Sequence, residues 1–431
     1  MSIIFGLGWL IPLWAGKTQS LTLQSAVDLA LAKNPNVQSN RLSVTQGEAA
    51  LHHSQAAWQP TLSAGTQLGH EQSLNSEAYQ TSWGANLALV KQWNRATSTQ
   101  VNVQQHLVQA LRAETVTSEE ELIASVSVAY IQALRDSSLV TLQLDNAGTQ
   151  ELKLAQVLAL IHAGTIAPGD SLQQQAALAQ SRLAVVQAQV AYQNSLANLS
   201  ALLGLDVIPS QISLQAIAPN HLVNVASFDP TQHSSDTVNN LAAQAQQERI
   251  LAAQASLLAA KQGYWPTFQV GATLATTTPL LTNPSTSTNK GSSQSLQLQA
   301  QIKVPIFDQQ DRAYQVTSAK IALETAQLNL KKTSQEQTNT TSIADRQVLS
   351  AQKNLQAAQL SENAAKQSFL DIQGRYQSGS LSLMDLKTSE SDARDAARTR
   401  IIAEYTLWDA YLNWSVAHHQ IRQVWQTLAE D

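Results

Sequence analysis

The sequence contains no cysteine, so disulfide bonds, thiolate metal ligands and thiol nucleophiles are excluded. Charged residues make up only 13% of the chain, roughly half the usual share, and uncharged polar residues take their place. A net charge of -5 argues against nucleic-acid binding, which depends on basic residues to neutralise phosphates. No apolar run reaches the ~18 residues that a membrane-spanning helix needs. A helical membrane protein is therefore excluded, whereas other kinds of membrane protein remain open.

Proline is absent between residues 61 and 167 and again after residue 305. Because proline inside a helix costs about 3 kcal/mol, proline-free tracts rich in Ala, Leu, Gln and Glu predict long helices. Asn94–Ala163 and Asp311–Ser378 are two such tracts, and each predicts a helix of roughly 100 Å. Apolar residues recur along both tracts at spacings of three and four, as in Leu154, Val157 and Ile161 or in Ala365, Phe369, Ile372 and Tyr376. This spacing predicts helices that pack along their length, in a coiled coil or a helical barrel.

The two halves of the sequence repeat one another. Trp58-Gln59-Pro60 aligns with Tyr264-Trp265-Pro266, and His162–Asp170 aligns with Tyr376–Asp385. Each half reads as helix, Trp-Pro boundary, strand, loop, strand, long helix, glycine turn and helix. The predicted division is a signal-peptide-like segment 1–20, a first repeat 21–204, a linker 205–236 and a second repeat 237–431. The linker contains a short apolar alternation, Ile212 and Leu214, that predicts a small strand.

The N-terminal segment only partly fits a signal peptide. Ile3–Trp14 has the length of a signal-peptide core, but no lysine or arginine precedes it. We expect either an atypical signal peptide or a sequence that starts inside a longer one, with an ordered N-terminal element as the alternative.

Four segments, at about 61–69, 82–90, 267–275 and 295–304, alternate apolar and polar residues with a period of two. Such a strand has one apolar and one polar face, and it fits either a sheet half-covered by a soluble core or a transmembrane barrel. The long helices favour the membrane, since nothing in such a bundle obviously covers a lone sheet. Because lipid tolerates no open sheet edge, four strands predict oligomers, with eight strands from a dimer or twelve from a trimer.

From Leu21 onward the sequence resembles the TolC-like outer-membrane efflux proteins. The resemblance is carried by the Trp-Pro strand openings and by the segments Leu29–Pro35, Val304–Asp308, Gly164–Asp170, Ala191–Gly204 and Arg375–Asp385. It implies a mainly α fold with membrane β-strands, in which duplicated long helical hairpins form an α-barrel. It also implies that the four strands of each chain form a 12-stranded barrel as a trimer, which selects the trimer over the dimer.

The resemblance further implies a non-enzymatic channel in the outer membrane of a Gram-negative bacterium, with a periplasmic helical extension. Its expected role is the exit duct of an efflux or secretion system, without cofactors. Its expected partners are two further copies of the chain, a periplasmic adaptor protein, an inner-membrane transporter and outer-membrane lipid. The alternative is a non-conducting trimeric coiled-coil structural protein or adhesin, although such a protein needs neither returning hairpins nor a duplication.

The candidate site lies at the two hairpin tips, which the resemblance identifies as the periplasmic entrance. Adaptor contact is expected at Gly164, Thr165, Ile166, Gly379, Ser380 and Leu381. The gate candidates are Asp170, Tyr376 and Asp385: Asp385 matches an acidic ring position, and Tyr376 with Asp170 matches a pair that links neighbouring hairpins in the closed state. Two family positions differ, because a second acidic ring position falls at Thr388 and an arginine position falls at Leu381. Asp170 has a second possible role, as the cap of the returning helix.

Two patterns that suggest other chemistry fail on inspection. Gly164–Ser171 resembles a phosphate-binding loop, but Asp170 occupies the position of the essential lysine, and the segment follows a helix rather than a strand. The adjacent pairs His52-His53 and His418-His419 point about 100° apart on a helix, so neither pair binds one metal from a single face. We expect these histidines to face solvent or the lumen, and no pattern in the sequence indicates an enzyme.

Overall fold

The computed structural model describes residues 19–72, 79–164, 168–205, 212–216, 225–226, 228–230, 241–282, 291–378 and 380–429. The chain divides into two compact units that are built from interleaved segments. Unit 1 consists of Met1–Ser39, Val116–Asn240 and Gln335–Asp431, and unit 2 consists of Asn40–Thr115 and Leu241–Ser334.

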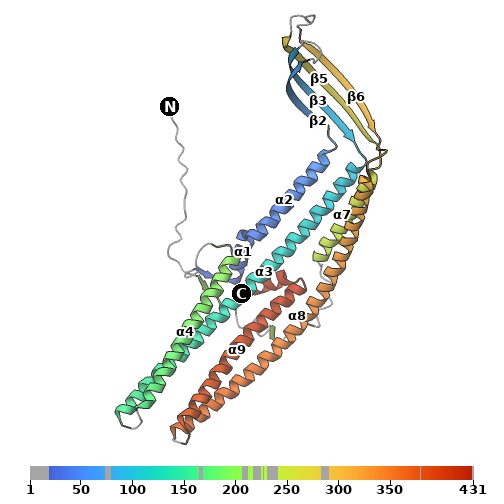
Figure 1. Cartoon of the computed structure of the whole chain (residues 1–431). Helices are drawn as coiled ribbons and strands as arrows, with labels where there is room; N and C mark the ends of the chain where they lie inside the picture. The colour runs from blue at the N-terminus through green and yellow to red at the C-terminus, as the bar shows by residue number, and fades with distance from the viewer. Residues whose placement is uncertain are drawn as a thin grey trace, which may run out of the picture. The chain divides into compact units, whose positions relative to one another are not determined.

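The helices and strands follow one another in a repeated order (Figure 1). The elements are β1 (Gln19–Leu21), α1 (Leu23–Lys33), α2 (Pro35–Ala56), β2 (Thr61–Gln72), β3 (Tyr79–Trp93), α3 (Ala96–His162), α4 (Gly169–Leu202), β4 (Ile212–Leu214), α7 (Leu241–Gln262), β5 (Thr267–Thr282), β6 (Ser293–Lys303), α8 (Asp311–Gln377), α9 (Leu383–Ala417) and α10 (Ile421–Ala429). The series helix, strand, strand, long helix, helix occurs as α2-β2-β3-α3-α4 and as α7-β5-β6-α8-α9. The long helices α3 and α8 both contain 67 residues, so the predicted mainly α fold with two long helices is confirmed. None of the described helices combines the length and the apolar character required to cross a membrane.

The sheet of unit 2 has the order β2-β3-β5-β6, and all its neighbouring strands are antiparallel. Its register gathers apolar residues on one face, where Leu89 lies opposite both Leu62 and Ala272. On the other face Gln269 lies opposite both Gln92 and Gln301. The predicted two-faced strands are therefore present, and most of them extend beyond the predicted segments because the backbone ladder continues through the flanking polar residues.

Aromatic and basic side chains surround the junction between the helices and this sheet. Lys91 lies 5.7 Å from the ring centres of both Trp58 and Trp93, and the Arg95 guanidinium lies 4.2 Å from the ring centre of Trp265. Trp58, Trp93 and Trp265 are each exposed by more than two fifths of their surface. The junction thus presents amphipathic rings together with positive charge, which is typical of a membrane–water interface.

The core of unit 1 joins the segments of the two sequence halves. Tyr130 of α3 is completely buried, and its hydroxyl lies 2.8 Å and 2.7 Å from the carbonyl oxygens of Leu21 and Gln215, between which it shares its proton. Burial raises the pKa of Tyr130 to about 12, so the hydroxyl stays a hydrogen-bond donor. Leu21 ends β1, which pairs in parallel with β4. The small strand predicted in the linker is therefore confirmed, and its partner β1 begins within the segment 1–20. The predicted signal-like run itself lies outside the described residues.

The Asn34-Pro35 step positions α2 against the end of α4. Pro35 occupies the first position of α2, where its missing N–H costs nothing, and the Asn34 side chain accepts a 2.9 Å hydrogen bond from the backbone of Asn36. The Asn34 amide also donates to the carbonyl of Leu202 at 3.0 Å. Gly204 has φ +65, and a Cβ there would lie 2.9 Å from the carbonyl oxygen of Lys33. Glycine is therefore required at this contact.

The prediction that the paired histidines face solvent or the lumen holds for the first pair but is wrong for His418. His52 and His53 are exposed as expected, but the His418 side chain is 8% exposed and stacks on Trp414. Its Nε2 lies 3.0 Å from the Asp345 carboxylate, so this histidine belongs to the core rather than to solvent. No group of three or more His, Asp or Glu residues in the described part of the chain has the arrangement of a metal site.

Candidate functional site at the hairpin ends

The first hairpin end is formed by α3 and α4. The N–H of Gly164 donates to the carbonyl of Ile161 at 2.9 Å, and Gly164 itself has φ +75, so it ends the helix in the left-handed region as predicted. The expected contact residues Thr165 and Ile166 lie outside the described residues. Asp170 is the second residue of α4, whose N-cap is Pro168 without a side-chain cap bond. The predicted capping role of Asp170 is therefore wrong, because the carboxylate sits inside the first turn instead of preceding it.

The second hairpin end is formed by α8 and α9. The backbone N–H of Ser380 donates to the carbonyl of Arg375 at 3.0 Å, which closes the end of α8, while Gly379 lies outside the described residues. Ser382 caps α9: its hydroxyl accepts from the Asp385 backbone at 3.2 Å, and its backbone N–H donates to the Asp385 carboxylate at 3.1 Å. Hydrogen bonds from the Ser382 hydroxyl and backbone lower the pKa of Asp385. The exposed gate candidate Asp385 therefore carries a full negative charge at neutral pH.

The tip residues are not joined to one another within the described chain. Tyr376 is 36% exposed and makes no hydrogen bond to Asp170 in the single chain. Thr388, at the second ring position, uses its hydroxyl within α9 by donating to the Met384 carbonyl at 3.0 Å. The proposed link between Tyr376 and Asp170 of neighbouring hairpins stays a prediction, because it requires another copy of the chain.

Above the tips, a buried polar cluster joins α3, α4 and α9, and the sequence reasoning missed it. The Gln150 side-chain amide donates to the Glu390 carboxylate at 2.8 Å, and the Gln174 amide donates to the Gln150 side-chain oxygen at 2.8 Å. Lys153 forms an ion pair with the other carboxylate oxygen of Glu390. Gln150, Gln174 and Glu390 are 4%, 4% and 7% exposed, so water does not compete strongly for these bonds.

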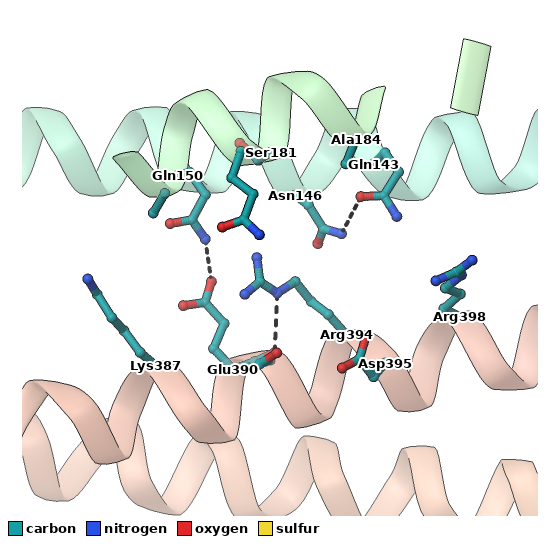
Figure 2. A pocket seen from close by; sticks show the side chains of 13 residues that line it. Gln143, Asn146, Gln150, Ser181, Ala184, Lys387, Glu390, Arg394, Asp395 and Arg398 are labelled. Carbon is teal, nitrogen blue, oxygen red and sulfur yellow. Dashed lines mark hydrogen bonds between the residues drawn. The ribbon is translucent and has the colours of Figure 1, made fainter. Parts of the chain in front are cut away.

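The cluster borders a cavity of about 290 Å³ with polar walls that carry both basic and acidic groups. Figure 2 shows Gln150 and Glu390 directed toward each other from α3 and α9, with Lys387, Arg394 and Arg398 along α9. The Arg394 Nε–H donates to the backbone carbonyl of Glu390. The buried hydrogen bonds and the ion pair are suited to holding two helical hairpins together.

One signal in the sequence could have revealed the cluster. Gln150 lies four residues before Leu154, on the line that continues through Val157 and Ile161. A polar side chain at an apolar seam position is typical of a residue that fixes the register of packed helices. The partner Glu390, distant in sequence, is not identifiable from spacing alone.

Comparison with known proteins assigns the chain to a family. Residues 26–205 and 236–428 match the family model of the outer membrane efflux protein. The chain therefore belongs to the outer membrane efflux protein family. It is also 26% identical over 346 residues to Protein CyaE of Bordetella pertussis, a match that covers 73% of this chain and 66% of CyaE. The chain thus spans slightly less than two thirds of that relative's length.

Solved structures share the fold. The Campylobacter jejuni CmeC outer membrane channel superposes with a TM-score of 0.77 at 15% identity, covering 95% of this chain and 89% of CmeC. The outer membrane protein VceC of Vibrio cholerae superposes with a TM-score of 0.74 at 15% identity, covering 92% of this chain and 95% of VceC. The predicted resemblance, the mainly α fold with β-strands and the location in the outer membrane of a Gram-negative bacterium with a periplasmic helical extension are confirmed. The family and fold are those of efflux channels rather than enzymes.

Proposed function

We propose that this protein is a homotrimeric outer-membrane channel, the exit duct of a multi-component efflux or secretion system, gated at its periplasmic helical tips. Its partners are two further copies of the chain, a periplasmic adaptor protein and an inner-membrane transporter. The chain itself carries no energy-coupling chemistry in this proposal. It supplies a passive path across the outer membrane.

The observation that carries the proposal is the four-stranded sheet with two unpaired edges. β2 and β6 are the first and last strands of the sheet, and each pairs on one side only within the described chain. A sheet in lipid must satisfy every backbone N–H and C=O, so its edges must pair with strands from other copies. The β6 edge of one copy meeting the β2 edge of the next closes twelve strands from three chains. Family membership supports the trimer over the eight-stranded dimer.

The exposed apolar face of the sheet supports its insertion in lipid. The apolar residues on this face with the largest exposed fractions are Leu298 at 75%, Leu68 at 70%, Leu296 at 67%, Leu62 at 66% and Ile302 at 65%. A contiguous exposed apolar surface of this kind requires a cover, and the aromatic junction with Trp58 and Trp265 suits the membrane boundary. The opposite face, rich in glutamine and threonine, then faces the water-filled lumen.

The hairpin ends are the proposed gate and adaptor-binding region. Adaptor contact is assigned to Gly164, Thr165, Ile166, Gly379, Ser380 and Leu381. Asp170, Tyr376 and Asp385 are assigned to the gate. The ionised, exposed carboxylate of Asp385 supports this assignment, because three copies would form a negatively charged ring at the opening. Such a ring attracts cations to the entrance and repels anions from it.

Disulfide trapping tests the closure of the sheet. The chain has no cysteine of its own, so introduced cysteines are the only thiols. Ser63→Cys in β2 combined in turn with Gln297→Cys, Gln299→Cys or Gln301→Cys in β6 samples three registers on the polar face. Oxidation of membranes should give covalent trimers for one pair. Ser63→Cys alone should stay monomeric on denaturing gels, and a ladder ending at dimers would contradict the trimer.

Planar-bilayer recording tests conduction. The purified protein should give discrete conductance steps, whereas a non-conducting coiled-coil adhesin should give none. Co-purification from cross-linked cells should recover a periplasmic adaptor protein. Intact trimers that insert in bilayers without conductance, also in variants with altered tips, would overturn the channel function.

A further inference from the structure

A polar cavity lies at the base of the sheet of unit 2, on the polar face. Its volume is about 320 Å³, and its walls include Gln92, Gln269 and Gln301 together with Lys303 and Arg312. The three glutamines form one row across β3, β5 and β6, since Gln269 lies opposite both of the others. Lys303 lies opposite Thr267, at the end of the same face. The cavity therefore combines amide hydrogen-bond donors with two basic groups, and no carboxylate belongs to its lining.

The two basic groups differ in how far their charge is already neutralised. The Arg312 guanidinium lies 3.4 Å from the Asp308 carboxylate and 5.6 Å from the ring centre of Tyr264, and it donates to the Pro305 carbonyl. Lys303 is exposed, and its ammonium has no ionic partner among the residues that the structure describes. Lys303 is also the only lysine or arginine that the described strands place on the polar face. The acidic Glu71 lies on that face near the other end of the sheet, at the end of β2.

We propose that this cavity is a binding site for anionic groups, such as carboxylates and phosphates of small solutes, and that Lys303 gives the conduit an anion preference at this level. The inference rests on the proposed function, because a trimer would bring three copies of Lys303 into one lumen. The amides of Gln269 and Gln301 complete the site by donating hydrogen bonds to the bound oxygens. The charge of the three lysines is opposite to that of the negative ring proposed for Asp385, so the two sites favour ions of opposite charge.

Lys91 provides a matched control within the same sheet. It lies near the same end of the sheet as Lys303, but on the apolar face, where its ammonium donates to the Trp58 carbonyl and contacts the rings of Trp58 and Trp93. Removing the Lys91 charge therefore changes the net charge of the protein by the same amount without changing the polar face. Any effect specific to Lys303 must come from its position on the lumen side.

The test is ion selectivity in planar bilayers of zwitterionic lipid under a tenfold gradient of potassium chloride. Lys303→Gln should lower the chloride-to-potassium permeability ratio at least about twofold, and Lys91→Gln should leave it unchanged. Inorganic tripolyphosphate should reduce the conductance of the parent and of Lys91→Gln but not that of Lys303→Gln. The selectivity difference should shrink as the salt rises from 0.1 M to 1 M, because the Debye length falls from about 10 Å to about 3 Å.

A chemical version of the test changes the charge at position 303 only after the channel has assembled, so effects on selectivity are separated from effects on assembly. Lys303→Cys is assembled first and then modified with 2-(trimethylammonium)ethyl methanethiosulfonate, which should restore the parent selectivity. Modification with the negatively charged 2-sulfonatoethyl reagent should shift the selectivity further toward cations. This inference would be overturned if the channels conduct but neither modification changes their selectivity. It would also be overturned if Lys91→Gln lowers the chloride-to-potassium permeability ratio as much as Lys303→Gln does. Either result would leave the channel function intact. Absence of conductance in the parent and in every variant would instead overturn the proposed function and this inference with it.

Discussion

The side-chain amide of Gln150 donates a 2.8 Å hydrogen bond to the carboxylate of Glu390, and this bond joins α3 to α9. Each residue belongs to a different hairpin, α3 with α4 and α9 with α8, so the bond connects the two hairpins of unit 1. Lys153 neutralises the same carboxylate. Gln150 and Glu390 are buried and the Lys153 side chain is 25% exposed, so water competes weakly for these bonds. We expect the cluster to hold the two hairpins in register.

Replacing Glu390 should destabilise the protein. Glu390→Ala leaves the Gln150 amide and the Lys153 ammonium without their acceptor, and an unsatisfied buried group costs about 1–3 kcal/mol. The thermal unfolding midpoint of the detergent-solubilised protein should fall accordingly. Glu151→Ala is the matched control, since Glu151 pairs with Arg182 at 3.3 Å on an exposed surface where such pairs contribute about 0–1 kcal/mol. Equal unfolding midpoints for the two variants would show that the buried cluster contributes no more to stability than an exposed ion pair does.

Stability should also depend on the titration of Asp409. Burial raises the pKa of Asp409 to about 6, although Arg135 opposes the shift, and one carboxylate oxygen has no hydrogen-bond partner among the described residues. The folded state thus holds a proton more tightly than the unfolded state, whose Asp pKa is about 3.9, so stability falls as pH rises between about 4 and 6 and is constant above. A pKa raised from 3.8 to about 6 corresponds to at most about 3 kcal/mol.

Asp409→Asn should therefore raise the unfolding midpoint at pH 7.5, and this gain should disappear as the pH is lowered to 4. Unfolding curves across this range measure it, with Asp395→Asn, on the same helix, as the control for general loss of charge. A gain for Asp409→Asn that stays constant from pH 7.5 to pH 4 would rule out the titration.

Two glycines, Gly148 inside α3 and Gly164 just beyond its end, should change the unfolding midpoint in opposite directions when replaced by alanine. Gly164 has φ +75, where an alanine side chain costs roughly 1–2 kcal/mol, so Gly164→Ala should lower the unfolding midpoint. Gly148 lies inside the helix and a Cβ there meets nothing within 4 Å, so Gly148→Ala should stabilise by about 0.5–1 kcal/mol. Midpoints that move in the same direction for both variants would contradict the assigned end of α3.

The long helices and the strands were predictable because their signals are local. The absence of proline between residues 61 and 167 limits where α3 can break, and the alternation Leu296, Leu298, Ala300 and Ile302 fixes which residues of β6 share a face. The strand pairing then follows the same pattern, since Leu298 lies opposite Ala272 in the observed register.

Two of the failures concern contacts between residues that are distant in sequence. His418 was predicted to face solvent or the lumen, but its ring lies within hydrogen-bond distance of Asp345 of α8, which is 73 residues earlier in the chain and which its own spacing does not reveal. It also stacks on Trp414, four residues earlier, a neighbour that helical spacing does indicate. The helix-capping role of Asp170 failed for a local reason, because α4 already begins at Gly169 with Pro168 as its cap. The partner of Gln150 was missed because helix spacing identifies a seam position but not the residue opposite it.

The predicted link between Tyr376 and Asp170 of neighbouring hairpins should affect conductance. A phenol that donates to a carboxylate forms a charge-assisted bond of roughly 1.5–3 kcal/mol, enough to bias a two-state opening without locking it. Tyr376→Phe combined with Asp170→Ala should therefore raise single-channel conductance, while trimer content and expression stay at the parent level. Asp371→Ala is the control, because it removes an exposed carboxylate of the same helix that pairs with Arg375 at 3.2 Å instead of with the tip tyrosine. Since Asp170 does not cap α4, unchanged conductance in an intact trimer would leave the Tyr376–Asp170 pair without a role in gating.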